Sequence, residues 1–390
     1  MTLKKLIAQL HLWLGLSSGL VVLILGLTGA IYTFSDDIKD IVYKDRRYVS
    51  TVPNHKRLPL DTLLGIARQS LGEKHKITRA ELSQDPTRSY MFRAFKINKD
   101  GTGYWNYYQY YLKVYIDPYT GKVLFKEDAS KEFFTIVLAL HMNLLLGDGI
   151  GHFIVQWSTV CFGLLLLSGL VLWWPKKWKR KQLKQNFAVK WNSKFKRLNY
   201  DLHNVLGFYV LFPLLIIALT GLAWSFKLTT DKKSKVLSDT TLTTKASANQ
   251  ILTQALAKSP KTAYFLYNFP ATKSGTVNLS AYQSNTHLYD RLQYRFDQYN
   301  GKLIQTSNPM ASTALSAKLV ALNYDLHTGS ALGLFGKLLA FFASLIAATL
   351  PVTGLIIWLK KGKKTEKPQQ KHTANKIKQT KASKSIVTIY

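Results

Sequence analysis

The sequence contains very little cysteine and few acidic residues. Of 390 residues only Cys161 is a cysteine, and there are 21 acidic side chains against 53 basic ones. A single cysteine excludes disulfides, cysteine-ligated iron–sulfur clusters and covalent attachment of a c-type haem. No G-x-G-x-x-G motif follows a strand-like run, so the chain lacks a dinucleotide-binding fingerprint. It therefore cannot draw on NAD(P)H unaided.

The excess positive charge, formally +32, lies beside apolar runs rather than along one basic face. Lys4 and Lys5 precede the first run, residues 175–197 between the second and third contain no acid, and a Lys-rich tail follows the fourth. The positive-inside rule explains this distribution better than phosphate binding does, so we exclude nucleic acid as a partner. The same rule puts both termini and the middle loop in the cytoplasm.

Four apolar runs are long enough to cross about 30 Å of hydrocarbon, which takes roughly 20 helical residues. No small-residue cleavage site follows the first run, which indicates a retained anchor rather than a signal peptide. We therefore expect a multi-pass protein in a lipid bilayer. The runs are Leu10–Phe34, Phe153–Trp174, Val205–Phe226 and Leu334–Leu359.

Each half of the chain consists of a span, an external region and a second span, and the halves repeat one another. LHLWLGLSSGLVVLILGLTGAIYTF aligns without a gap with LHNVLGFYVLFPLLIIALTGLAWSF. LHMNLLLGDGIG parallels LHTGSALGLFG, and SGLVLWWPKK parallels TGLIIWLKKG after a short slip. These matches predict a mainly α membrane protein whose four transmembrane helices come from two parallel repeats.

The two external regions are also alike. Each opens with a helical stretch (LDTLLGIARQSLG and ANQILTQALAK) and continues into alternating, aromatic-rich strands. Each ends in a hairpin-like phrase, VYIDPYTGKVLF or YRFDQYNGKLIQ, with Gly where a tight turn needs positive φ. We expect two small α+β modules outside the membrane. The predicted boundaries are 1–34 (N-terminus and first span), 35–131 (module 1), 132–174 (outer helix and second span), 175–200 (basic loop), 201–226 (third span), 227–311 (module 2), 312–359 (outer helix and fourth span) and 360–390 (cytoplasmic tail).

Histidine recurs at fixed points of this repeat. His11 and His203 open the first and third spans, and His141 and His327 precede the second and fourth. We call the first two the inner pair and the other two the outer pair. An ionisable side chain at membrane depth is costly, so function is the default hypothesis for it. His152, which opens the second span without a counterpart, is either an alternative outer ligand or an interfacial histidine.

Glycines accompany the histidines in both repeats. Gly15 and Gly207 follow the inner pair by one helical turn and leave room for a flat, bulky group. Gly29 and Gly221 come 18 residues after the inner histidines (29 − 11 and 221 − 203), which is five whole turns. They therefore share the histidines' helix face but lie at the opposite membrane surface.

Paired imidazoles among small residues are what a bis-histidine b-type haem requires. The pattern predicts two haem b groups, one held by each pair of histidines. Zinc fits less well, because no Asp, Glu or Cys accompanies a pair to complete four ligands. Close helix packing around glycine is the alternative that involves no cofactor.

Together these motifs resemble the PepSY-associated transmembrane helix family, iron-regulated inner-membrane proteins that include ferric-siderophore reductases. The resemblance extends to about Lys364 and rests on LHxWLGL and LHNVLG, the LTG triplets, LHMNLLLG and LHTGSALG, the span endings and the two PepSY-like hairpin phrases. It implies a bacterial inner membrane, periplasmic PepSY-like modules near the substrate, and two haems that carry electrons outward.

The function implied is a di-haem transmembrane reductase of a ferric siderophore or other ferric chelate. Its electron donor would be external, a quinol or a flavin reductase, and we assign no catalytic side chain. The alternative is a non-catalytic PepSY scaffold or regulator of a periplasmic partner, with structural histidines. A transporter fits least, because the repeats are parallel and Lys337 is the only charged residue within a span.

Overall fold

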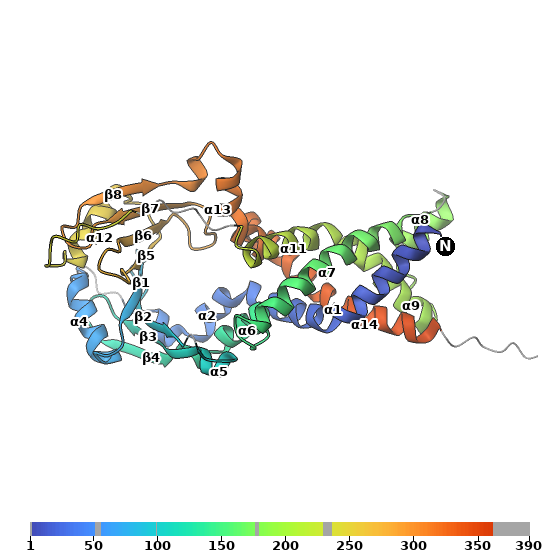
Figure 1. Ribbon diagram of the computed structural model, residues 1–390, viewed down its shortest axis with the longest axis horizontal. Helices are drawn as coiled ribbons and strands as arrows, with labels where there is room; N and C mark the ends of the chain where they lie inside the picture. Colours follow the sequence, from blue (N-terminus) through green and yellow to red (C-terminus); the bar gives the residue numbers. More distant parts are fainter. Residues whose placement is uncertain (1, 51–55, 99, 176–178, 229–235, 362–390) are drawn as a thin grey trace, which may run out of the picture.

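The computed structural model describes residues 2–50, 56–98, 100–175, 179–228 and 236–361. A helical bundle forms one end of the molecule and a β-sheet flanked by helices forms the other (Figure 1). The N-terminus and the end of α14 both lie at the end of the bundle remote from the sheet. The predicted tail falls almost wholly outside the described residues.

Three helices in the described part of the chain are long and apolar enough to cross a membrane by themselves: α1 (Leu3–Thr33), α7 (Ile150–Trp173) and α14 (Gly333–Lys361). The helices α1 and α14 pack closely, since a Cβ added at Gly26 would lie 2.7 Å from the Ser344 carbonyl oxygen. This contact brings together the first and the last long helix of the described chain.

The predicted third span, Val205–Phe226, is not one straight helix. This part of the chain is built from α9 (Phe195–Asp201), which precedes the predicted span, a π-helical turn η2 (Leu202–Leu206), α10 (Gly207–Tyr209) and α11 (Leu211–Ser225). The two parts bend by 63° at Val210 and meet the criteria for a membrane span only when counted together. Pro213 gives the physical reason, because it lacks an N–H and its ring clashes with the carbonyl four residues earlier.

Shorter helices connect these spans to the sheet and cover it. The apolar α6 (Phe133–Asn143) precedes α7, and α13 (Leu315–Thr328) precedes α14. The remaining helical segments are α2 (Ser35–Val42), α3 (Lys44–Arg47), α4 (Leu60–Leu71), α5 (Tyr104–Tyr107), η1 (Ala129–Lys131), α8 (Arg180–Phe187), α12 (Ala248–Lys258), η3 (Pro309–Ala311) and η4 (Ser330–Leu332).

The two external regions form one antiparallel sheet of eight strands, in the order β4-β3-β2-β1-β5-β6-β7-β8. The halves join where β1 pairs with β5, with Arg79 opposite Asn268 and Ser83 opposite Tyr264. The strands are β1 (Ile77–Ser83), β2 (Tyr90–Ile97), β3 (Tyr108–Ile116), β4 (Val123–Asp128), β5 (Tyr264–Asn268), β6 (Val277–Tyr282), β7 (Arg291–Phe296) and β8 (Leu303–Ser307).

The two external regions share a single core, so the structure joins what the sequence predicts as two modules. The predicted helices form as α4 and α12, and the hairpin glycines Gly121 and Gly301 have φ of 75° and 68°. Buried side chains from both halves, such as Phe92 and Phe296, nevertheless belong to one cluster under these two helices. The joining of β1 to β5 satisfies backbone groups that would otherwise be exposed on two sheet edges.

The two helices also cap one another across the repeat. The Asp61 carboxylate in the first turn of α4 accepts hydrogen bonds from the Ser247 hydroxyl and from the backbone N–H groups of Ala248 (2.9 Å) and Asn249 (3.1 Å). Asn249 Oδ1 in turn accepts from the N–H of Leu60 at 3.2 Å. Each helix thus satisfies unpaired N–H groups of the other.

Candidate functional site

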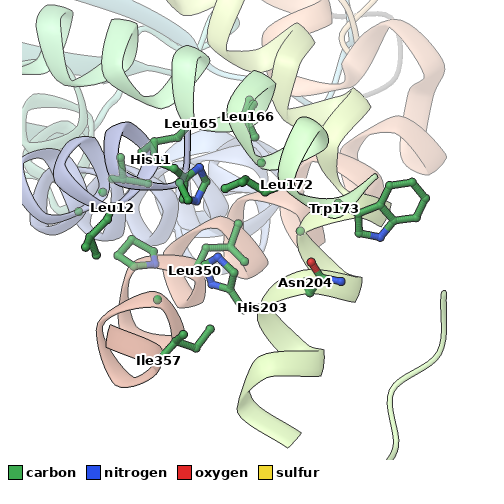
Figure 2. A pocket seen from close by; sticks show the side chains of 18 of the residues that line it. His11, Leu12, Leu165, Leu166, Leu172, Trp173, His203, Asn204, Leu350 and Ile357 are labelled. Atoms are coloured by element: carbon green, nitrogen blue, oxygen red, sulfur yellow. The ribbon is translucent and has the colours of Figure 1, made fainter. Parts of the chain in front are cut away.

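The inner pair lies inside the bundle, at the end remote from the sheet. His11 comes from α1 and His203 from the π-helical turn η2, and their ring centres are 6.4 Å apart with the ring planes at 85°. Figure 2 shows both rings reaching into one cavity from different helices. The structure thus brings together two residues that are 192 positions apart in the sequence (203 − 11).

The outer pair lies at the end of the bundle nearer the sheet. His141 is in the last turn of α6 and His327 in the last turn of α13. Their ring centres are 6.2 Å apart, with the planes at 74°. Trp224 packs against His327 with ring centres 5.3 Å apart, and Tyr324 lies 6.0 Å from Trp224. Aromatic rings therefore border this pair on the α11 and α13 side.

Each of the four histidines is held by a hydroxyl on the neighbouring helix of its own repeat. Imidazole Nδ1 contacts a Ser or Thr oxygen at 2.9–3.0 Å in every case. The four partnerships are His11 with Ser168, His203 with Thr353, His141 with Thr28, and His327 with Thr220. The contact is therefore a feature of the repeat and not of one site.

These hydroxyls determine which ring nitrogen carries the proton. Ser168 Oγ donates its only hydrogen to the Leu164 carbonyl at 2.7 Å, so both of its bonds are satisfied only if His11 Nδ1 donates. Thr28 and Thr220 make the same backbone bond at 2.7 Å, and Thr353 makes it at 3.0 Å. A protonated Nδ1 leaves Nε2 with a free lone pair, which is the form of histidine that ligates a metal.

His327 gives the firmest assignment. Its Nδ1 also lies 3.0 Å from the carbonyl oxygen of Ile217, and a carbonyl can only accept a hydrogen bond. Nδ1 of His327 therefore carries a proton whatever the orientation of the Thr220 hydroxyl. Its ring has two acceptors for this proton, whereas His11 has Ser168 alone in the described contacts.

A glycine follows each hydroxyl and forms the surface on which the ring rests. A Cβ added at Gly29 would lie 3.2 Å from Cε1 of His141, and one at Gly221 would lie 3.3 Å from Cε1 of His327. The inner histidines rest in the same way on Gly169 (3.4 Å) and Gly354 (3.3 Å). The Nδ1–Cε1 edge of each ring thus faces the glycine-bearing helix.

The sequence reasoning found Gly29 and Gly221 but missed the hydroxyls beside the four glycines. The signal was present, because Ser or Thr precedes the glycine in LTG of both repeats, in SGLVLWW and in TGLIIWL. Ser and Thr inside apolar helices commonly donate to the carbonyl four residues earlier in their own helix. Their presence therefore does not indicate a site unless the structure shows the histidines opposite them.

The cavity beside the inner pair has a volume of about 450 Å³, within the range of cofactor sites. Gly15 and Gly207 line it, and no side chain lies closer than 3.7 Å to where their Cβ atoms would be. Trp173 and Phe208 form one wall as a stacked pair with ring centres 3.7 Å apart. A cavity thus adjoins the inner histidines at the two glycines for which the sequence predicts room.

Residues 8–361 match the family model for the PepSY-associated TM region. The chain belongs to this family. None of the curated proteins compared with the chain matches it. All four paired histidines, with their hydroxyls and glycines, lie inside the matched region of the PepSY-associated TM region family.

His152 belongs to neither pair. Its Nε2 lies 3.2 Å from the carbonyl oxygen of Ser225 at the end of α11, which only accepts, so Nε2 donates. Gln156 donates to the same oxygen at 3.3 Å. In this conformation His152 joins α7 to α11 and its Nε2 has no free lone pair for an iron.

Each site offers only two imidazole nitrogens, which favours a metal whose other ligands come from a cofactor and not from the protein. Among the described residues, no group of three or more His, Cys, Asp or Glu side chains is arranged to hold a metal ion. Two imidazoles on opposite sides of a flat chelate are what an iron porphyrin needs, whereas a tetrahedral ion needs four protein ligands or an open position. The residues present therefore fit a haem.

Proposed function

We propose that the protein is a di-haem transmembrane reductase that passes electrons to a ferric chelate on the sheet side of the membrane. The inner pair would hold one haem b and the outer pair a second. Each haem supplies reversible one-electron chemistry at its iron. The observation that carries the proposal is the spacing of the two imidazole pairs.

The spacing can be compared with simple coordination geometry. A metal–imidazole bond is about 2 Å long and the ring centre lies roughly 1.1 Å beyond the nitrogen, so two imidazoles across one metal have centres roughly 6.2 Å apart. The ring centres in the structure are 6.4 Å apart in the inner pair and 6.2 Å apart in the outer pair. Edge-to-face packing of rings spans the same range, so the free Nε2 atoms and the adjoining cavity provide the further support.

The protein's own residues perform three tasks in this proposal. The four histidines offer Nε2, and their hydroxyl partners keep the proton on Nδ1 and fix the ring plane. The glycines let each ring approach its neighbouring helix closely. Apolar side chains such as Leu166 and the Trp173–Phe208 stack line the cavity beside the inner pair and would limit the access of water to a bound group.

The charge distribution supports this direction of transfer. Basic residues gather at the end of the bundle that carries the start of α1, the end of α14, α8 and α9, as expected for the cytoplasmic side of a bacterial inner membrane. Without a nucleotide fingerprint the donor would be a quinol or a flavin reductase. One electron reduces Fe³⁺ to Fe²⁺, which hard oxygen ligands hold less tightly, so the iron is released.

The proposal is tested with full-length protein reduced by dithionite under anaerobic conditions and mixed with ferric citrate. We expect the reduced haem bands to disappear while an equivalent amount of Fe²⁺ is trapped by a ferrous-specific chelator. A His141→Ala/His327→Ala variant should be at least about tenfold slower, since one of two carriers is lost. His287→Ala is the control, because that ring stacks on Tyr289 in the sheet region. Unchanged rates in the double variant would contradict the proposal, and absent haem bands would favour the scaffold.

A further inference from the structure

The sheet has one apolar face and one face of mixed character that carries its charged side chains. The apolar face packs under α4 and α12, while the other is turned toward the bundle (Figure 1). In β1, β2 and β5 the alternate residues that leave the core include charged and aromatic side chains, among them Arg79, Arg93 and Tyr264, beside the aliphatic Met91 and Leu266. They are partly exposed rather than buried. This face is accordingly available to a ligand in a way that the core face is not.

Two arginines stand directly opposite one another on this face. Arg79 of β1 and Arg93 of β2 are register partners in the middle of the sheet. Like charges in this position repel one another. Burial, and then the charge of Arg79, lower the pKa of Arg93. Two adjacent guanidinium charges are unfavourable unless an anion between or beside the two side chains offsets their repulsion.

The described protein groups do not supply that anion. No ion pair within 4.0 Å joins Arg79 or Arg93 to a carboxylate in the described chain. Arg79 Nε donates only to the neutral Asn268 amide oxygen, at 2.7 Å. Arg93 Nε is buried and has no hydrogen-bond partner. Arg93 otherwise interacts with Tyr111 and lies 5.2 Å from the Phe95 ring centre, and neither group carries a negative charge. Arg88, in contrast, makes two 2.7 Å bonds to the Asp40 carboxylate.

Other charged groups near this face leave the pair uncompensated. Glu127 is bound by Arg46 and lies 3.7 Å from Lys113. Glu81 leaves β1 on the same face as Arg79 but makes no ion pair in the described chain. A third cation, Arg291, lies over the Tyr282 ring at 6.0 Å. Positive charge therefore predominates around Arg79 and Arg93.

Aromatic rings surround the arginines. Tyr264 and Tyr282 are stacked with centres 4.7 Å apart and planes at 5°. Tyr111 packs edge-on against Phe95 at 5.2 Å and interacts with Arg93. Rings with hydroxyls beside guanidinium groups suit a flat ligand rich in anionic oxygens.

From this juxtaposition we infer that the Arg79–Arg93 face binds an anionic, oxygen-rich chelate, and that the ferric substrate of the proposed function is of this class. The identification of the ligand as substrate rests on the proposed function, whereas its binding does not. The sheet region contacts α13 where the Leu288 N–H donates to Asp325 Oδ1 at 2.9 Å. On the same helix, Tyr324 contacts Trp224, which in turn packs on His327 of the outer pair.

The test separates binding from reduction by using gallium(III) in place of iron(III), because gallium has the same charge and is not reduced. Two synthetic hexadentate chelates are compared by equilibrium dialysis against the full-length protein in nanodiscs. One is a trianionic tris(catecholamide) complex and the other a neutral tris(hydroxamate) complex. We expect the trianionic complex to bind at least about tenfold more tightly, with a preference that weakens as salt is added.

Variants locate the effect. Arg79→Gln/Arg93→Gln should abolish the preference without changing binding of the neutral complex, and Arg79→Gln alone should reduce it. Both should unfold at the wild-type temperature or above, since repulsion is relieved. Arg68→Gln, which removes the same charge from the exposed side of α4, is the matched control. Equal binding of the two complexes by wild type, or an unchanged preference in the double variant, overturns the inference. Haem bands recorded on the same samples report separately on the proposed function.

Discussion

One hydroxyl contacts each of the four paired histidines, and it fixes which imidazole nitrogen carries the proton. These hydroxyls belong to Ser168, Thr353, Thr28 and Thr220. A hydroxyl that has donated its hydrogen to its own helix can only accept from imidazole Nδ1. The same four contacts orient the rings and leave Nε2 free. A purely packing role for the histidines would not require the same acceptor four times.

The histidines differ in whether a second acceptor remains when the hydroxyl is removed. This difference provides a matched pair of variants. In Ser168→Ala the Nδ1 proton of His11 loses the acceptor described for it, and we expect haem affinity at the inner pair to fall about 10- to 100-fold. In Thr220→Ala the Ile217 carbonyl still accepts from His327, so the fall at the outer pair should be much smaller. Haem content after dialysis against apomyoglobin measures both, with Ser168→Thr as the rescue variant. Equal losses in both alanine variants would contradict the assigned roles.

Helix packing sets where these side chains meet. The helices α1 and α14 touch so closely at Gly26 that a Cβ there would lie 2.7 Å and 2.8 Å from backbone atoms of Ser344 and Ala348. Neither backbone atom can move without displacing α14. Since Thr28 and Gly29 follow one turn or less after Gly26 on the same helix, the position of α1 also determines the support of His141.

Gly26→Ala tests this dependence. We expect overpacking of about 1–3 kcal/mol, seen as a lower unfolding temperature and reduced haem occupancy at the outer pair. Gly163→Ala on α7 is the control, because no atom lies within 4 Å of the position that its Cβ would take, and the substitution should change neither quantity. Identical behaviour of the two variants would show that the α1–α14 contact is not limiting.

The reciprocal caps of α4 and α12 make the joined sheet sensitive to acid. Burial alone would raise the Asp61 pKa, but hydrogen bonds from Ser247, Asn249 and Ala248 lower it on balance. A carboxyl whose pKa is lowered by folding stabilises the fold above its unfolded pKa, about 3.9, and loses that contribution as pH falls through the folded value.

Asp61→Asn should therefore weaken the first turn of α12 at neutral pH and remove this acid dependence. Loss of a cap costs about 1 kcal/mol, which corresponds to roughly fivefold faster hydrogen exchange of the amides it binds. Exchange measured by mass spectrometry on residues 247–252 tests this, with the first turn of α4 as a partial control because Asn249 still caps Leu60. Unchanged exchange at neutral pH would rule out a stabilising cap.

The sequence predicts those features that depend only on the regular repeat of a single helix, such as which residues share a helix face. Five whole turns connect His11 to Gly29, so helical phase alone predicted a shared face. The bend at Val210 was missed because Pro213 was counted as part of an apolar run, although it cannot complete a straight helix.

The joining of the two halves was beyond local reasoning. The pairing of β1 with β5 links residues nearly 190 positions apart, and nothing in the alternation of either strand indicates which edge it meets. The Arg79–Arg93 pair could not be recognised for the same reason, since it depends on the register of β1 against β2. Long-range pairing thus creates a polar face that neither repeat reveals by itself.

The most direct test of the account is the haem-to-protein ratio of the purified full-length protein, measured with its reduced-minus-oxidised spectrum. The account predicts bis-histidine bands and about two haems per chain, falling to one in His11→Ala/His203→Ala and to one, with different bands, in His141→Ala/His327→Ala. Wild-type protein without haem, or full haem content in either double variant, would contradict it.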